Sequence, residues 1–128
     1  MSILVDTHIL LWAVHEPARL SPDTQKLLDD PGTEVWFSVV NIWEAVIKHA
    51  LRPPDFGIDP RRLRRGLLEH DWRELAVSGE HALAVGDLPP LHKDPFDRML
   101  LAQAKVEGLT LITSDDLLAQ YPGRVRKV

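Results

Sequence analysis

The sequence predicts a single α/β domain in which helices flank a central, mostly parallel sheet. Short apolar runs alternate along the chain with longer segments of helical periodicity, a pattern typical of parallel α/β folds. The length of 128 residues suits one domain spanning 1–128 and leaves no room for a second. With 45% hydrophobic and 27% charged residues, the composition excludes intrinsic disorder as the main state.

The N-terminal segment predicts the first strand and the first helix. An apolar run at residues 3–5 predicts a strand that stops at Asp6. Thr7 follows directly, and its hydroxyl makes it the predicted N-cap of a helix over residues 8–14. This first strand is expected to be central in the sheet.

The next part of the chain predicts a surface helix, a strand and the clearest helix of the sequence. Proline and glycine bracket a helix at residues 22–30, and a β-branched and aromatic run at 35–37 predicts the second strand. Ser38 is the predicted N-cap of the helix that follows. That helix carries one apolar stripe, which we expect to be buried, at Val39, Ile42, Trp43, Val46, Ile47 and Ala50.

Proline, glycine and capping residues mark the element ends in the second half of the chain. The predicted helices cover residues 59–70, 78–86, 94–107 and 114–120. The predicted strands cover residues 74–77 and 109–112, with a last edge strand at 125–128. Loops are predicted at residues 52–58 and 87–93, and Gly108 is the expected C-terminal cap of the longest of these helices.

Charge and residue usage limit the possible chemistry. The net charge of −4 excludes a protein that holds nucleic acid by bulk positive charge. The absence of cysteine excludes disulfides, thiolate nucleophiles and zinc–thiolate sites, and the six histidines do not cluster at metal-ligand spacing. The chain shows no basic leader and no run of about 18 apolar residues. We therefore expect a soluble cytoplasmic protein without membrane contact.

Acidic residues follow the strands of the predicted sheet. In open α/β sheets, ligands bind at the carboxyl ends of the strands. Asp6 follows the first strand, and Asp115 and Asp116 follow the strand at 109–112. Glu44 lies on the helix after the second strand, and its long side chain can lean back toward the start of that helix. These acids can therefore converge at one end of the sheet.

Asp97 occupies an odd position for a solvated charge. It continues the apolar stripe of its helix, together with Leu100, Leu101 and Ala104. A carboxylate on a buried face is costly without a partner, and clustered carboxylates bind protons or a cation. Oxygen ligands select hard cations, so the pattern predicts a Mg²⁺ or Mn²⁺ site. Such a site can polarise a phosphodiester and lower the pKa of a water, which indicates metal-assisted hydrolysis of a phosphate ester.

The segments ILVDTHILLW, SVVNIWEAVIK, DPFDRMLLAQA and LTLITSD occur in this order. Through them nearly the whole chain resembles PIN-domain ribonucleases, more specifically VapC-type toxins of bacterial toxin–antitoxin pairs. The resemblance implies a PIN-like three-layer fold, an acidic Mg²⁺ or Mn²⁺ site and cleavage of single-stranded RNA. It also implies a homodimer that is silenced by a VapB-type antitoxin protein docking beside the site. Carried over by motif, it implies catalytic and metal-binding roles for Asp6, Glu44, Asp97 and Asp115, and supporting roles for Thr7, Ser38 and Thr113.

Two assignments keep an alternative. The DPFDR segment offers both Asp94 and Asp97, and Asp94 can instead cap the helix that begins at Pro95. We favour Asp97, because it precedes the apolar helix in the register of the family. Asp116 is a similar reserve for its neighbour Asp115.

Charged residues near these acids also allow more than one interpretation. Glu44 could be a solvated helix charge beside Lys48, four residues on. Lys93 and Arg98 flank the acidic cluster and could contact phosphate or neutralise carboxylates. A further basic helix face, either a solvated surface or a patch that tracks RNA phosphates, consists of Arg61, Arg62, Arg64 and Arg65.

Two other functions fit part of the pattern. A response-regulator receiver has a similar length, a parallel α/β fold and an acidic Mg²⁺ pocket. In this chain the first strand ends in the single acid Asp6, and no phosphorylatable aspartate directly follows the strand at 74–77. The strand at 109–112 is followed by Thr-Ser-Asp where a receiver would place a lysine. A PIN fold that binds RNA or a regulatory partner without catalysis is disfavoured by the presence of all four acids.

Overall fold

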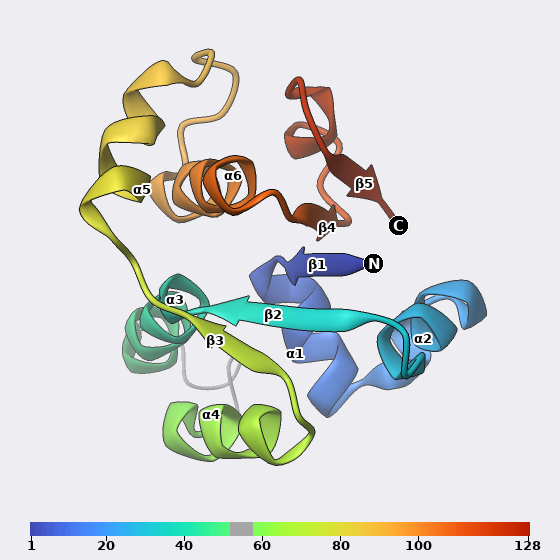
Figure 1. The fold of residues 1–128 in the computed structure, drawn as a ribbon. Helices are drawn as coiled ribbons and strands as arrows, with labels where there is room; N and C mark the ends of the chain where they lie inside the picture. The colour runs from blue at the N-terminus through green and yellow to red at the C-terminus, as the bar shows by residue number, and fades with distance from the viewer. Residues whose placement is uncertain (52–57) are drawn as a thin grey trace.

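The computed structural model describes residues 1–51 and 58–128, and it shows a five-stranded sheet with helices on both faces (Figure 1). The strands lie in the order β3-β2-β1-β4-β5, and each neighbouring pair is parallel. The predicted α/β class and the central first strand are therefore confirmed. The strands are β1 Ser2–Val5, β2 Glu34–Ser38, β3 Arg73–Leu75, β4 Thr110–Thr113 and β5 Val125–Lys127.

Within the described residues, six α-helices and three 3₁₀ turns connect the strands. The helices are α1 Thr7–His15, α2 Pro22–Asp29, α3 Val39–Leu51, α4 Pro60–Glu69, α5 Gly79–Ala84 and α6 Pro95–Glu107. The 3₁₀ turns are η1 Pro17–Arg19, η2 Val85–Asp87 and η3 Leu118–Gln120. None of these helices combines the length and the apolar character that crossing a membrane requires.

The cap of α1 differs from the prediction. Asp6, not Thr7, is the N-cap: its backbone is still extended, and its Oδ1 accepts a hydrogen bond from the N–H of Ile9 at 2.9 Å. Thr7 is already the first helical residue, and its hydroxyl points to Glu44 instead. The prediction failed because both residue types can cap a helix, and the local sequence does not say where the strand releases the chain.

The other predicted element boundaries differ only slightly from those in the structure. The helices predicted to begin at 59, 78 and 94 are capped by Asp59, Ser78 and Asp94, and Gly108 ends α6 in the left-handed conformation. The predicted helix at 114–120 is only the turn η3, because the chain becomes extended again at Tyr121. The predicted loop at 52–58 lies, apart from Ile58, outside the described residues.

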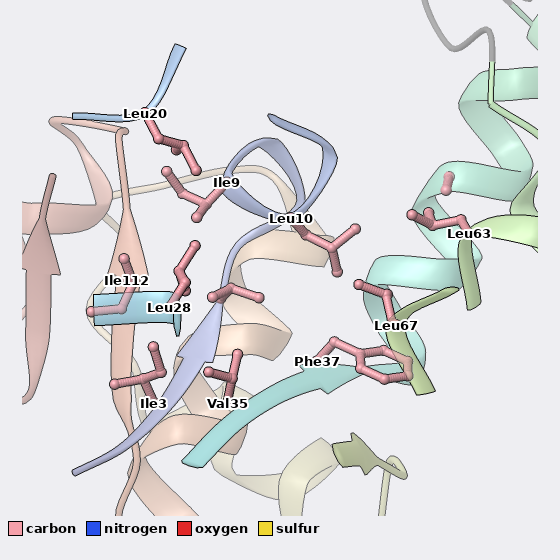
Figure 2. Close-up of a cluster of buried hydrophobic side chains, with 12 residues drawn as sticks. Ile3, Ile9, Leu10, Leu20, Leu28, Val35, Phe37, Leu63, Leu67 and Ile112 are labelled. Carbon is pink, nitrogen blue, oxygen red and sulfur yellow. The ribbon is translucent and has the colours of Figure 1, made fainter. Parts of the chain in front are cut away.

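Side chains alternate along the strands and divide the core into two clusters, one on each face of the sheet. The cluster covered by α1, α2 and α4 includes Ile3, Val5, Val35, Phe37 and Ile112 (Figure 2). The cluster under α6 includes Leu4, Leu100, Leu101 and Leu111. Because both faces of the sheet are covered, the space left for polar chemistry is at the ends of the strands.

The apolar stripe of α3 does not behave as predicted. The buried side chains of this helix are Val40, Asn41, Glu44 and Ala45. On the predicted stripe, Val39, Trp43 and Val46 are exposed, Trp43 by 59%. Ile42 packs against the core, but for Val39, Trp43 and Val46 the prediction was wrong. Periodicity locates the apolar side of a helix but does not show that the fold buries a polar side. The helix thus turns two polar residues inward and leaves an apolar face open.

The strand register brings the ends of β1, β2 and β4 to the same edge of the sheet. Val5 pairs with Ile112, and Leu4 pairs with Trp36. The residues that follow each strand end, among them Asp6, therefore meet where α1, α3 and α6 begin. The predicted acidic centre lies at this edge.

Candidate metal centre

Asp6 is a buried acid with both carboxylate oxygens hydrogen-bonded. It is only 3% exposed, its Oδ1 accepts from Ile9 and its Oδ2 accepts from the hydroxyl of Thr113. Burial raises the pKa of Asp6 above its ordinary value; the nearby Glu44 adds to this, and the two hydrogen bonds oppose it. The Thr113 hydroxyl also accepts from the backbone N–H of Asp115 at 3.0 Å. Thr113 therefore links two of the predicted acids.

Glu44 lies on the buried side of α3, with both carboxylate oxygens engaged. Its Oε1 accepts from the hydroxyl of Thr7 at 2.5 Å, and its Oε2 accepts from Lys48 Nζ at 2.5 Å. Asn41 donates through Nδ2 to the same Thr7 hydroxyl at 3.0 Å, so this hydroxyl is held in place. The pair with Lys48 exists, but Glu44 is 2% exposed, which excludes the solvated interpretation.

Burial and the charges of neighbouring acids shift the pKa of Asp97. Burial, followed by repulsion from Asp94 and Glu44, raises the pKa of Asp97 to about 7. Asp6 adds to this repulsion, and His92 opposes it. A carboxylate that burial, and then repulsion from other carboxylates, drives toward its neutral form marks a place that a cation would stabilise. The charges of Asp94, Glu44 and Asp6 therefore all act on Asp97.

Asp115 joins the cluster through His92. The Nε2 atom of His92 lies 3.2 Å from Asp97 Oδ2 and 3.3 Å from Asp115 Oδ2. Ligand atoms from these three residues lie within 4.8 Å of one another. Burial alone would raise the pKa of Asp115, but the N–H groups of Leu117 and Leu118 and the bond from His92 outweigh it, so the pKa is lowered.

The structure treats the two reserve acids differently. Asp94 caps α6 with Oδ1, which accepts from Phe96 N–H at 2.8 Å and Asp97 N–H at 3.4 Å, and it lies close enough to repel Asp97. Asp116 is 80% exposed at its side chain and pairs with Lys127. Asp94 is therefore a neighbour of the cluster, whereas Asp116 points away from it.

Ser38 supports the centre from a distance. Its hydroxyl accepts from Val40 N–H at 2.9 Å, the predicted capping role, and donates to Gln103 Oε1 at 2.5 Å. The Gln103 amide donates in turn to the carbonyl of Ala76 at 3.3 Å. Ser38 thus ties the start of α3 to α6, the helix that carries Asp97.

The basic residues that the sequence predicted as RNA contacts differ in whether they bond other parts of the chain. The guanidinium of Arg98 donates to the carbonyls of Val85, Pro89 and His92, so it holds the chain before α6. On α4, Arg64 forms a salt bridge with Glu74 at 2.6 Å. The remaining basic candidates are all exposed, namely Arg61, Arg62, Arg65 and Lys93.

The donor set fits a hard divalent cation. Carboxylate oxygens come from the end of β1, from α3, from α6 and from the segment after β4. Threonine hydroxyls donate to Asp6 and Glu44, and Lys48 adds one positive charge at Glu44. Oxygen ligands of this kind suit Mg²⁺ or Mn²⁺. Such a cation would offset the repulsion that raises the pKa of Asp97.

The pKa of Asp97 predicts that the metal-free protein loses stability as pH rises. The ordinary pKa of this carboxyl is 3.8, and in the fold its pKa is about 7. Between these values the folded state holds a proton that the unfolded state releases, so this stabilising contribution is lost as pH rises through about 7. Urea unfolding in chelator at about pH 5 and about pH 8 measures the effect. Asp97→Asn should show a smaller loss than wild type, and equal losses would contradict the assignment.

The comparisons with known proteins agree with this architecture. The family model of the PIN domain matches residues 3–124. The structure resembles VapBC2 from Rickettsia felis bound to a promoter DNA fragment, with a TM-score of 0.74, 14% identity, and coverage of 100% of this chain and 99% of that chain. For a toxin–antitoxin complex from Klebsiella pneumoniae the TM-score is 0.67, with 20% identity and coverage of 98% and 99%.

A third similar structure is DNA-bound VapBC from Salmonella typhimurium, with a TM-score of 0.70, 14% identity, and coverage of 99% of this chain and 98% of that chain. No curated protein sequence matches the chain. These likenesses confirm the PIN-like fold, with its parallel sheet between layers of helices. Since the family model covers nearly the whole sequence, the chain belongs to the PIN domain family.

Proposed function

We propose that this protein is a Mg²⁺- or Mn²⁺-dependent endoribonuclease that cleaves single-stranded RNA in the cytoplasm, as the toxin of a toxin–antitoxin pair. The observation that carries the proposal is the acidic cluster of Asp6, Glu44, Asp97 and Asp115 at the strand ends of a PIN-family sheet. When bound, the cation would neutralise charge on the phosphodiester and activate water.

The chain's own residues hold this centre in shape before any ligand arrives. Asp6 is fixed by Ile9 and Thr113, and Glu44 is fixed by Thr7 and Lys48. Carboxylates held in this way need little rearrangement to accept a cation, which favours catalysis by a preorganised site. We propose the exposed basic side chains of Arg61, Arg62, Arg65 and Lys93 as contacts for RNA phosphates.

Cleavage of an RNA pool by the purified protein tests this function. Single-stranded RNA of mixed sequence is incubated with Mg²⁺, with Mn²⁺ or with chelator, and a duplex of the same sequence serves as the control. We expect cleavage of the single strand with either metal and none in chelator. Folded protein that cleaves nothing would overturn the proposal in favour of a non-catalytic PIN domain. The receiver alternative does not fit a member of the PIN family.

The toxin role draws its support from the solved relatives. The similar structures from Rickettsia felis and Salmonella typhimurium are VapBC complexes, and that from Klebsiella pneumoniae is a toxin–antitoxin complex. We propose that this chain likewise has a VapB-type antitoxin partner. Induced expression in a bacterium without that partner should arrest growth, and Asp97→Asn should not. Unimpaired growth at matched protein levels would contradict the toxin role.

We propose that the protein forms a homodimer through the exposed apolar face of α3, α5 and α6. A hollow of about 640 Å³ lies there, lined by Val39, Trp43, Val77, Phe96 and Met99. The Trp43 ring meets the edge of Phe96 at 5.1 Å between centroids, and apolar patches of this kind mark interaction surfaces. Symmetric dimers are the commonest assembly that such a patch supports.

Trp43→Glu should convert the dimer to a monomer, because pairing would then bury an unpaired charge from each copy. Light scattering coupled to size exclusion gives the mass in solution. Leu68→Glu is the control, since Leu68 is similarly apolar and exposed but lies on α4. A monomeric wild type would contradict the dimer and leave this face to the antitoxin.

A further inference from the structure

His92 bridges two acids of the metal centre although no part of the family assignment involves it. It lies between η2 and α6, in the chain segment just before the DPFDR sequence. Its backbone N–H donates to the hydroxyl of Tyr121 at 2.7 Å, and its carbonyl accepts from Arg98 at 3.4 Å. The main chain of His92 is therefore held from two sides, and its ring is 14% exposed.

The hydrogen bonds of the ring determine where its proton lies. The backbone N–H of Asp94 donates to Nδ1 of His92 at 3.0 Å. A nitrogen that accepts a hydrogen bond carries no proton, and a neutral imidazole has one proton to place. The proton is therefore on Nε2, which faces Asp97 Oδ2 at 3.2 Å and Asp115 Oδ2 at 3.3 Å. His92 is thus a hydrogen-bond donor to Asp115 Oδ2, and Asp97 Oδ2 lies beside the same nitrogen as a charged neighbour.

This arrangement argues against His92 as a metal ligand. Ligation through Nε2 needs that nitrogen without a proton, so the proton would have to move to Nδ1. The bond from Asp94 N–H would then be lost, and a donor would face a donor. The chain before α6 is held in the form that keeps Nδ1 as acceptor, by the contacts of Tyr121 and Arg98.

The position of His92 between Asp97 and Asp115 affects how these two carboxylates are held relative to each other. Asp97 is on α6 and Asp115 follows β4, so no shared element fixes the distance between their carboxylates. Asp115 Oδ1 is taken by Leu117 N–H at 2.8 Å, which leaves Oδ2 as the oxygen that faces the centre. The Nε2–H of His92 lies beside both Oδ2 atoms and bonds that of Asp115, so it offsets the repulsion between them.

We propose that His92 is a positioning residue of the metal centre, which holds Asp97 and Asp115 in one arrangement by donating its Nε2 proton to Asp115 while the same nitrogen lies against Asp97. The inference rests on the proposed function, because it concerns how the acids of that function are held. It adds a residue that supports the cation site through its ligands. Hydrogen-bonded partners of metal ligands are known to act in this way.

Two substitutions separate the two ends of the ring. His92→Asn keeps an acceptor near the position of Nδ1, for the Asp94 N–H, but lacks a donor at the position of Nε2. His92→Gln does the reverse, since its amide nitrogen reaches the position of Nε2. If His92 positions the acids, His92→Asn should weaken Mn²⁺ binding and lower kcat by about 10- to 100-fold, the usual cost of losing such a partner. His92→Gln should stay within about threefold of wild type on both measures.

A role confined to shaping the chain before α6 predicts the opposite order, with His92→Gln impaired and His92→Asn normal. That result would overturn the proposal, as would unchanged Mn²⁺ binding in His92→Asn by calorimetry. Long-range ¹H–¹⁵N spectra of the metal-free wild type provide a readout without metal or activity, and a proton on Nδ1 would also overturn it. Wild type that shows the Nε2 proton but neither binds Mn²⁺ nor cleaves RNA would refute the proposed function, not the contacts of His92.

Discussion

Asp97→Asn should lower the rate of RNA cleavage by roughly 10³-fold or more, whereas Asp94→Asn should stay within about threefold of wild type. Asp97 is the acid whose pKa responds to Asp94, Glu44 and Asp6 together, so it faces the centre of the cluster. Losing a carboxylate ligand there removes several kcal/mol of charge stabilisation, and each 1.4 kcal/mol corresponds to about tenfold in rate.

Asp94→Asn is the matched control because it changes the neighbouring acid and keeps its structural role. Asp94 caps α6, and asparagine caps helices as well as aspartate does. Single-turnover cleavage of one defined RNA, with saturating Mn²⁺, compares the two variants. Loss of activity in Asp94→Asn alone would keep the nuclease and move the metal ligand to Asp94. The Asp97→Asn protein should remain folded, since it loses a charge that burial disfavours.

Local sequence signals predicted most of the fold because the determinants are themselves local. The Asp-Pro pairs at 59–60 and 94–95 place a cap and a first-turn proline side by side, and both open helices. Strands β1, β2 and β4 are short apolar runs that no helix-forming pattern competes with. The acids could be placed from the same reasoning, because parallel strands end at one edge.

Contacts between distant segments could not be predicted in this way. His92 meets Asp115 across 23 positions of sequence, and nothing in the spacing of histidines indicates it. Ser38 and Gln103 are 65 positions apart, and their bond depends on how α3 packs against α6. Such pairs follow from the packing of whole elements, which one sequence does not encode in a readable local pattern.

The orientation of α3 shows most clearly that an apolar pattern does not by itself predict which side of a helix is buried. Its strongest pattern is the apolar stripe, yet the fold buries Asn41 and Glu44 and exposes Trp43. A rule that apolar residues lie inside fails here because the polar side of the helix faces the acidic cluster that we propose as a metal centre. The exposed apolar side then needs its own explanation, which the proposed dimer supplies.

Lys48→Met should destabilise the metal-free protein by about 2–3 kcal/mol. Removing one partner of a fully buried pair costs about 3–5 kcal/mol, because the other charge stays buried without compensation. The Glu44 side chain is 3% exposed and that of Lys48 33%, so solvent access at Lys48 places the effect below that range. The free energy of unfolding in urea with chelator measures the loss.

The double variant Lys48→Met/Glu44→Gln should recover most of that stability. Glutamine keeps an acceptor for the Thr7 hydroxyl, 2.5 Å from Glu44 Oε1, but carries no charge to leave unpaired. A double variant as unstable as Lys48→Met would show that the packing of the lysine chain matters more than its charge. Mn²⁺ should stabilise Lys48→Met more than it stabilises wild type, because a cation at the acidic cluster replaces the positive charge that Glu44 has lost. An equal gain in both proteins would mean that Glu44 is not among the groups that hold the metal.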